Sequence, residues 1–190
     1  MTSMVEHAER FLGPVQRGWS TDPDGGSMPF QIVEYEHGSD PESVAYSTLG
    51  LSRAGLVSPT SGREIRQELL MVLRRSVPAD VALSLLWQVG LTVLESGEAL
   101  LRGHVVGPAG RLAPETDLTA LYVTTPVYFP DELAWFAGAD GDVAVAWLVP
   151  IGTEEAQLVL ERGWDRFEDL VEEQDPDLVD LQRPSMRLAP

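Results

Sequence analysis

The serine nearest to a catalytic nucleophile is Ser52, in the pentapeptide GLSRA at residues 50–54. A nucleophile elbow needs a strand before the serine, a helix directly after it, and a histidine that acts as the base. A strand before Ser52 fits the sequence, but the segment that follows, AGLVSPTSG, holds two glycines and a proline and does not favour a helix. His104 is the only histidine downstream. These residues argue against serine hydrolysis.

Metal and cofactor chemistry also lacks the residues that it needs. The chain of 190 residues has no cysteine, and all thirteen of its basic residues are arginine. Without lysine there is no Walker-type phosphate clamp and no Schiff base. His7, His37 and His104 show no spacing that suggests a shared metal, and DPDGG at 22–26 lacks the alternating ligands of a calcium loop and reads as a turn. We therefore predict no metal, no cofactor and no enzymatic activity.

The carboxylates with the most telling spacing lie in WDRFEDLVEEQ, residues 164–174. Asp165, Asp169 and Glu172 are spaced i, i+4 and i+7, which places them on one face of a helix, and Glu173 lies beside them. Such a face is either a solvated surface or a docking surface for basic groups, and the sequence leaves both interpretations open. Paired carboxylates also serve glycoside hydrolysis, but the sequence shows no cleft for it.

The distribution of charge favours a basic protein as the partner. The net charge is −17, and residues 115–180 contain 17 acids and only two arginines, a net charge of −15. Nucleic acids and anionic membrane surfaces reward basic patches, so neither is expected to bind directly. The N-terminus lacks the basic start of a signal peptide, and the longest apolar run, 143–151, is too short to cross a bilayer. These features predict a cytoplasmic protein.

The elements that must position these residues follow from hydrophobic periodicity, which predicts one α/β domain with a mixed sheet and helices packed on it. A first helix ends at Gly13 and Pro14, and a long apolar segment after Pro78 reads as a buried helix. The segment 65–73 is interpreted as a strand, although helical spacing fits it almost as well. The predicted helices are 5–12 and 81–94, and the predicted strands are 30–35, 44–51, 65–73, 103–106, 118–124 and 143–148.

The C-terminal third predicts helical chain that is bent or interrupted at Gly163. Thr153 is the expected helix cap, and Glu154 and Glu155 complement the helix dipole in the first turn. Six apolar residues recur at helical spacing across Gly163: Ala156, Val159, Leu160, Trp164, Phe167 and Val171. Of these, Trp164, Phe167 and Val171 form the stripe that is expected to meet the core.

Several segments, taken in order, resemble the suppressor-of-fused (SUFU) domain family. They are YSTLGLS at 46–52, ELL at 68–70, the buried helix running into RGHVV at 102–106, AWLVPIGTEEAQLVLERG at 146–163, and DLQRPS at 180–185. The resemblance implies a compact α/β sandwich domain over residues 19–185, after an N-terminal helix at 1–18 and before a tail at 186–190. A peptide-binding region of the animal protein corresponds to Thr92 and His104, and His104 stands where family members often have an aspartate.

The resemblance implies a domain that works by binding protein. Bacterial members made of this domain alone are regarded as immunity proteins, which neutralise toxins of polymorphic or contact-dependent systems. The animal namesake restrains transcription factors of Hedgehog signalling with the help of a second domain, and that role is not expected of a single domain. We therefore predict an immunity protein whose partner is a toxin domain, with a basic nuclease as the first candidate. The alternative is a regulatory or scaffolding module that binds an extended peptide, and the oligomeric state is left open.

Overall fold

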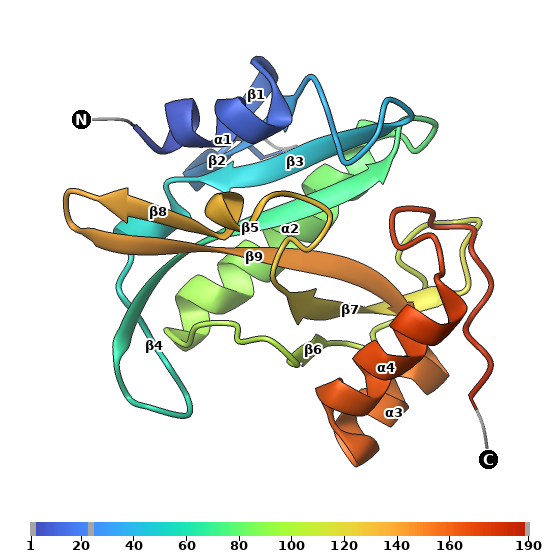
Figure 1. The fold of residues 1–190 in the computed structure, drawn as a ribbon. Helices are drawn as coiled ribbons and strands as arrows, with labels where there is room; N and C mark the ends of the chain where they lie inside the picture. Colours follow the sequence, from blue (N-terminus) through green and yellow to red (C-terminus); the bar gives the residue numbers. More distant parts are fainter. Residues whose placement is uncertain (1–2, 23–24, 189–190) are drawn as a thin grey trace.

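The fold is an α+β domain with one large mixed sheet, as the sequence predicts (Figure 1). A computed structural model describes residues 3–22 and 25–188. In chain order the elements are α1 (Met4–Leu12), β1 (Val15–Thr21), β2 (Ser27–Tyr35), β3 (Ser43–Leu49), the 3₁₀ turn η1 (Leu51–Arg53), β4 (Leu56–Val57), β5 (Glu64–Arg74), α2 (Ala79–Ser96), β6 (Val105–Val106), β7 (Leu118–Thr124), η2 (Asp131–Ala134), β8 (Trp135–Gly138), β9 (Gly141–Gly152), α3 (Thr153–Arg162) and α4 (Trp164–Gln174).

The sheet of the described chain has nine strands, seven of them in the order β1-β2-β3-β5-β9-β7-β6. The two central strands, β5 and β9, pair in parallel, and the other pairs are antiparallel. β4 pairs with β5 and β8 with β9, away from this path. The segment 65–73 is therefore a strand, which settles the ambiguity that the sequence leaves. β1 and β6 remain at the two ends of the order.

Helices cover both faces of the sheet because the strands alternate their side chains between two cores. On β5, Leu70 and Val72 join the core beneath α1, α3 and α4. Leu69 and Met71 of the same strand join the core beneath α2. β5 and β9 each contain a long run of consecutive buried residues, the pattern expected of strands covered on two faces. Figure 1 shows α2 behind the sheet, with α3 and α4 on the opposite face.

α2 confirms the predicted helix, extended by two residues at each end, but only one side of it is buried. Gly97 ends it in the left-handed conformation that favours glycine. Gly90 lies inside the helix, where a glycine normally destabilises. A Cβ at this position would be 2.4 Å from the ring of Phe30 on β2, so the glycine lets the helix approach the sheet. Close packing therefore outweighs helix propensity at this point.

The C-terminal helices confirm the interruption and correct the predicted apolar stripe. Gly163, with φ +90°, is both the C-cap of α3 and the N-cap of α4. Trp164 is 42% exposed, so the prediction that it meets the core was wrong. Trp164 is the first residue of α4, and its ring packs against the guanidinium of Arg102 instead of entering the core. Phe167 and Leu170 are the buried residues of α4.

A buried ion pair ties the chain after α4 to the first turn of α3, directly after the end of β9. Arg183 donates from both terminal nitrogens to Glu155, at 2.9 and 2.8 Å, and both side chains are almost fully buried. Glu155 also accepts from the backbone N–H groups of Gly152 and Met186. Burial alone would raise the pKa of Glu155, but Arg183 and these N–H groups hold the pKa below its usual value. The expected cap Thr153 is the first helical residue, and Gly152 is the N-cap.

The other predicted elements are present, although some are shorter than predicted. The strand at 118–124 is confirmed without change, whereas 103–106 narrows to the two residues of β6. The turn at 22–26 lies at the β1–β2 connection, where Gly25 N–H donates to the Asp22 carbonyl, and residues 23–24 lie outside the described residues. None of the described helices is long and apolar enough to cross a membrane.

Candidate functional site

The acidic stripe predicted on the last helix lies on the outer face of α4. Asp165, Asp169, Glu172 and Glu173 are all exposed, on the side of the helix away from its buried residues. Asp169 has Arg166 as an ion-pair partner, at a distance of 3.9 Å that gives a weak interaction at a surface. Within the described part of the chain, the other three carboxylates have no ion-pair partner. The stripe therefore presents nearly its full negative charge to solvent.

The next carboxylate of α4, Glu168, points inward and holds a network between the helix and the sheet. Both of its oxygens accept from Arg102, and it also accepts from the hydroxyls of Tyr122, at 2.6 Å, and Thr124, at 3.3 Å. Burial opposes the charge of Glu168, but these donors outweigh it and hold the pKa below its usual value. Burial, and next the hydrogen bond to Glu168, raises the pKa of Tyr122. Tyr122 therefore stays a donor and Glu168 a carboxylate at neutral pH.

Trp164 closes one side of this network. Its ring lies 4.3 Å from the guanidinium carbon of Arg102, so the arginine is held by a cation–π contact as well as by Glu168. Beside it, a cleft of about 170 Å³ lies between α4 and the loop after β7. Its walls are Arg102, Tyr122, Thr124, Val127, Val149, Phe167, Glu168, Val171, Glu172 and Leu178. Glu172 of the acidic stripe thus also belongs to a cleft.

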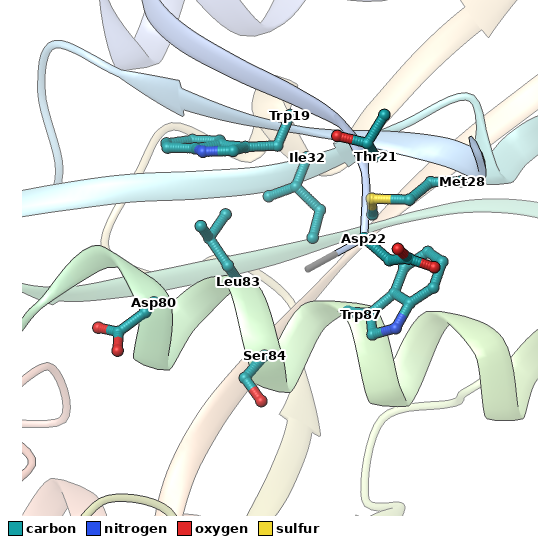
Figure 2. A pocket seen from close by; sticks show the side chains of 9 residues that line it. All are labelled: Trp19, Thr21, Asp22, Met28, Ile32, Asp80, Leu83, Ser84 and Trp87. Atoms are coloured by element: carbon teal, nitrogen blue, oxygen red, sulfur yellow. The ribbon is translucent and has the colours of Figure 1, made fainter. Parts of the chain in front are cut away.

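A larger groove lies on the other face of the sheet, between the β1–β2 hairpin and α2 (Figure 2). Its volume is about 450 Å³, within the range of ligand-binding pockets. Figure 2 shows Trp19 and Ile32 above the groove and Leu83 and Trp87 on the helix below it. The groove is mainly apolar and runs beside β1, which pairs only with β2 in the described sheet.

The residues proposed by analogy, Thr92 and His104, do not lie together in either hollow. Thr92 is exposed on α2 and its hydroxyl donates to the Gln88 carbonyl. His104 is half-buried just before β6, where its Nδ1 accepts from the backbone N–H of Leu101. Both side chains thus have local partners, and their role in binding stays a prediction.

The comparison with known proteins agrees with the resemblance seen in the sequence. The sequence pattern of the family described as "Suppressor of fused protein (SUFU)" matches residues 26–184. The chain belongs to the SUFU family. It is 23% identical over 144 residues to "Immunity protein YqcF" of Bacillus subtilis (strain 168), which covers 75% of this chain and 74% of that protein.

Solved SUFU structures share the fold. A crystal structure of a SUFU homologue from Neisseria gonorrhoeae FA 1090 has a TM-score of 0.76 at 17% identity, covering 98% of this chain and 96% of that one. A crystal structure of the Sufu–Fu complex has a TM-score of 0.74 at 16% identity, covering 96% and 90%. Drosophila Suppressor of Fused gives 0.63 at 18% identity, and there the match spans 83% of this chain but only 43% of the other.

Ser52, the nearest approach to a nucleophile in this SUFU domain, has a structural partner. It lies in η1, and its hydroxyl donates to Glu68 at 2.6 Å. Glu68 is fully buried and also accepts from the Thr48 hydroxyl and from the backbone N–H groups of Gly50 and Ser52. The donors to this carboxylate are hydroxyl and backbone N–H groups, so Glu68 holds the start of η1 and fixes it to β5. The described residues contain no group of three potential metal ligands.

Sequence reasoning missed the two hollows of the SUFU domain. Arg102 and Glu168 are separated by 66 positions, and no local pattern links them. Trp19 and Trp87 line one groove from a strand and a helix on either side of it. A strand signal over 15–21 could have placed Trp19 at the sheet edge, but this segment has no regular alternation of apolar residues. Only the tertiary fold brings these side chains together.

Proposed function

We propose that this SUFU domain is an immunity protein, which binds a toxin domain in the cytoplasm and blocks it without covalent chemistry. The first candidate for the toxin is a basic nuclease. The observation that carries the proposal is the outer face of α4, where Asp165, Glu172 and Glu173 have no ion-pair partner among the described residues. A similar protein bears the name immunity protein, and that name supports the same role here.

Uncompensated surface charge affects both the helix that carries it and the encounter with a partner. Like charges four residues apart on a helix destabilise it by a few tenths of a kcal/mol per pair. Asp165 and Asp169 stand at this spacing, and the nearest arginine side chain lies 3.9 Å from Asp169. A field of this kind speeds the encounter with a basic partner and repels nucleic acid. A nuclease that must attract phosphates presents the complementary surface.

The test is capture followed by rescue. The tagged full chain is used to purify its partner from the native host, and the partner gene is then expressed alone and together with this chain. The proposal expects the partner to stop growth when expressed alone and to be harmless when co-expressed. A partner that is harmless alone, or whose toxicity this chain does not relieve, would refute an immunity role.

A second candidate function is a regulatory or scaffolding module that binds an extended peptide. The observation that favours it is the position of β1 at the end of the sheet, beside the apolar groove of Trp19, Leu83 and Trp87. A peptide added to an edge strand gains backbone hydrogen bonds and places alternate side chains in a neighbouring groove. Such binding would be insensitive to salt. Leu83→Asp would then abolish partner capture, whereas changes to the acidic stripe would leave it unaltered.

A further inference from the structure

The cleft beside α4 combines an apolar wall with a carboxylate at its mouth. Val171 and Leu178 line it together with Val127, whose side chain is 59% exposed. Glu172 lines the same cleft and is exposed, with no ion-pair partner within the described residues. Lysine and arginine bury an aliphatic stem against apolar surface and keep a charged head in water. The arrangement of these walls matches that shape and charge.

We infer that this cleft receives one lysine or arginine side chain of the protein partner, with the cationic head at Glu172 and the stem against Val127 and Val171. This inference rests on the proposed function and names where that partner makes its central contact. It differs from a general acidic surface, because it assigns the contact to a single hollow and a single class of side chain.

The size of the cleft favours a side chain over a small-molecule ligand. A volume of about 170 Å³ lies below the range of roughly 300–1,000 Å³ found for drug-sized ligands. The charge around it excludes an acidic occupant. Glu168 and Glu172 line the cleft together with a single cation, Arg102, which Glu168 already engages. A neutral apolar side chain would desolvate Glu172 without compensating its charge.

The cleft is held in shape before any partner arrives. Arg102 is fixed by Glu168 on one side and by the ring of Trp164 on the other. Gly103 follows with φ +90°, and a Cβ there would be 2.6 Å from the Trp164 ring, so the turn packs against the tryptophan only as glycine. Rigid walls lower the entropic cost of binding. Binding therefore does not have to offset a free-energy cost of ordering the cleft.

The surroundings of the cleft have the composition of an interface centre. Trp164, Val127 and Tyr128 are large apolar side chains that stay exposed near the cleft, at 42%, 59% and 41%. Aromatic residues and arginine are enriched at the centre of protein interfaces, and charged residues belong to the rim. Asp165 and Asp169 lie on the same helix and would form such a rim. An acidic rim around an apolar centre suits a partner with one inserted cation and further basic residues around it.

The direct probe is the capped peptide acetyl-Gly-Gly-Arg-Gly-Gly-amide, with citrulline in place of arginine as its uncharged isostere. Binding to the ¹⁵N-labelled full chain is followed by NMR at two signals, the Val127 backbone amide and the Trp164 indole N–H. The spectrum of Trp164→Phe, which lacks the indole signal, assigns the latter. We expect saturable shifts at these two signals, with the citrulline peptide about threefold to tenfold weaker, as for a charge-assisted contact that stays partly hydrated. Shifts centred elsewhere, equal binding of both peptides, or no saturable binding would overturn the inference.

The matched variants are Glu172→Gln and Glu173→Gln, which remove the same charge from neighbouring positions of α4. Glu173 lines a different hollow, with Arg166 and Arg187, so it reports the general field without the cleft. Glu172→Gln should weaken the peptide about threefold to tenfold and Glu173→Gln less than twofold. In Val127→Arg, the introduced side chain should occupy the mouth of the cleft and abolish binding of the arginine peptide. An equal loss in the two glutamine variants would show only the diffuse field and overturn the inference.

The captured partner separates this inference from the proposed function. If partner binding survives both Glu172→Gln and Val127→Arg while rescue persists, the cleft assignment fails and the immunity role stands. If the partner is not toxic but the arginine peptide binds as expected, the immunity role fails and the cleft assignment stands. A dimer in sedimentation that Glu172→Gln dissociates and Glu173→Gln does not would place a second copy in the cleft and overturn the assignment to a partner.

Discussion

Replacing Arg183 by methionine should destabilise the domain strongly, because it leaves a carboxylate buried without its counter-charge. Glu155 is 0% exposed and would keep only the N–H groups of Gly152 and Met186, at 2.7 and 2.8 Å. Removing one member of a buried ion pair costs about 3–5 kcal/mol, a large share of the roughly 5–15 kcal/mol that stabilises a typical domain. We expect Arg183→Met to lose about that amount at pH 7, measured by urea unfolding.

The double variant Glu155→Gln/Arg183→Met isolates the interaction. The glutamine side-chain oxygen can still accept the N–H of Gly152, and no buried charge remains, so the double variant should be more stable than Arg183→Met. The interaction free energy from the four proteins should be about 2 kcal/mol or more. The slope of the unfolding free energy against urea should stay unchanged, because the same surface is exposed on unfolding.

The pH dependence gives an independent check of the same pair. The pKa of Glu155 is lowered in the folded protein, so the pair contributes its full stability above the unfolded pKa of about 4.3 and loses it as the pH falls through the folded pKa. In Arg183→Met the carboxylate of Glu155 is buried without a counter-charge, so burial raises its pKa above the unfolded value. The free-energy gap between wild type and variant should therefore shrink as the pH falls, first through the raised pKa of the variant's carboxylate and then, below about 4.3, through the lowered pKa of the wild type. A loss under about 1 kcal/mol at pH 7, or a gap independent of pH, would refute this account.

Two further substitutions test the packing that positions the site. Gly90→Ala should lower the free energy of unfolding in urea by about 1 kcal/mol or more, because the clash with Phe30 outweighs the gain in helix propensity. Its control, Ser84→Ala on the exposed side of α2, should change the free energy by no more than about 0.5 kcal/mol. A Gly90→Ala protein that is more stable than wild type would contradict the close approach of helix and sheet. Glu68→Gln should lower the free energy of unfolding by about 2–3 kcal/mol, because the amide cannot accept all the hydrogen bonds of the buried carboxylate. Its control is Glu64→Gln, at the exposed start of β5. Equal stability of these two variants would refute the capping role of Glu68.

The predictable parts of the fold are those that local periodicity encodes. The segment 118–124 is a mostly apolar run bounded by turn residues, and it is a strand with the predicted ends. The break at Gly163 follows from a glycine inside a helical pattern, and it was predicted. Trp164 was misplaced because it shares the helical spacing of the buried Phe167, although it is the first residue of α4. The tryptophan packs against Arg102 and stays 42% exposed.

The unpredicted parts depend on exposure or on distance along the chain. β1, with the sequence VQRGWST, is an edge strand that is mostly exposed, so it needs little apolar alternation. Glu155 was interpreted as a charge that favours the helix N-terminus, and it does accept the Gly152 N–H. Its pairing with Arg183, 28 residues later, has no signal in either local sequence. The acidic stripe was predicted because its spacing is local, whereas the residues that line the cleft beside it come from five separate segments of the chain.

The most direct test of the central claim is the association rate of the captured partner as a function of salt. The variant Asp165→Asn/Asp169→Asn/Glu172→Gln removes three charges from the stripe, and Glu42→Gln/Glu95→Gln/Glu98→Gln removes three exposed charges elsewhere. For wild type, the association rate should fall at least about tenfold between roughly 50 and 500 mM NaCl. The stripe variant should lose most of that dependence and the control variant should keep it. Identical salt slopes in all three proteins would contradict an acidic docking face on α4.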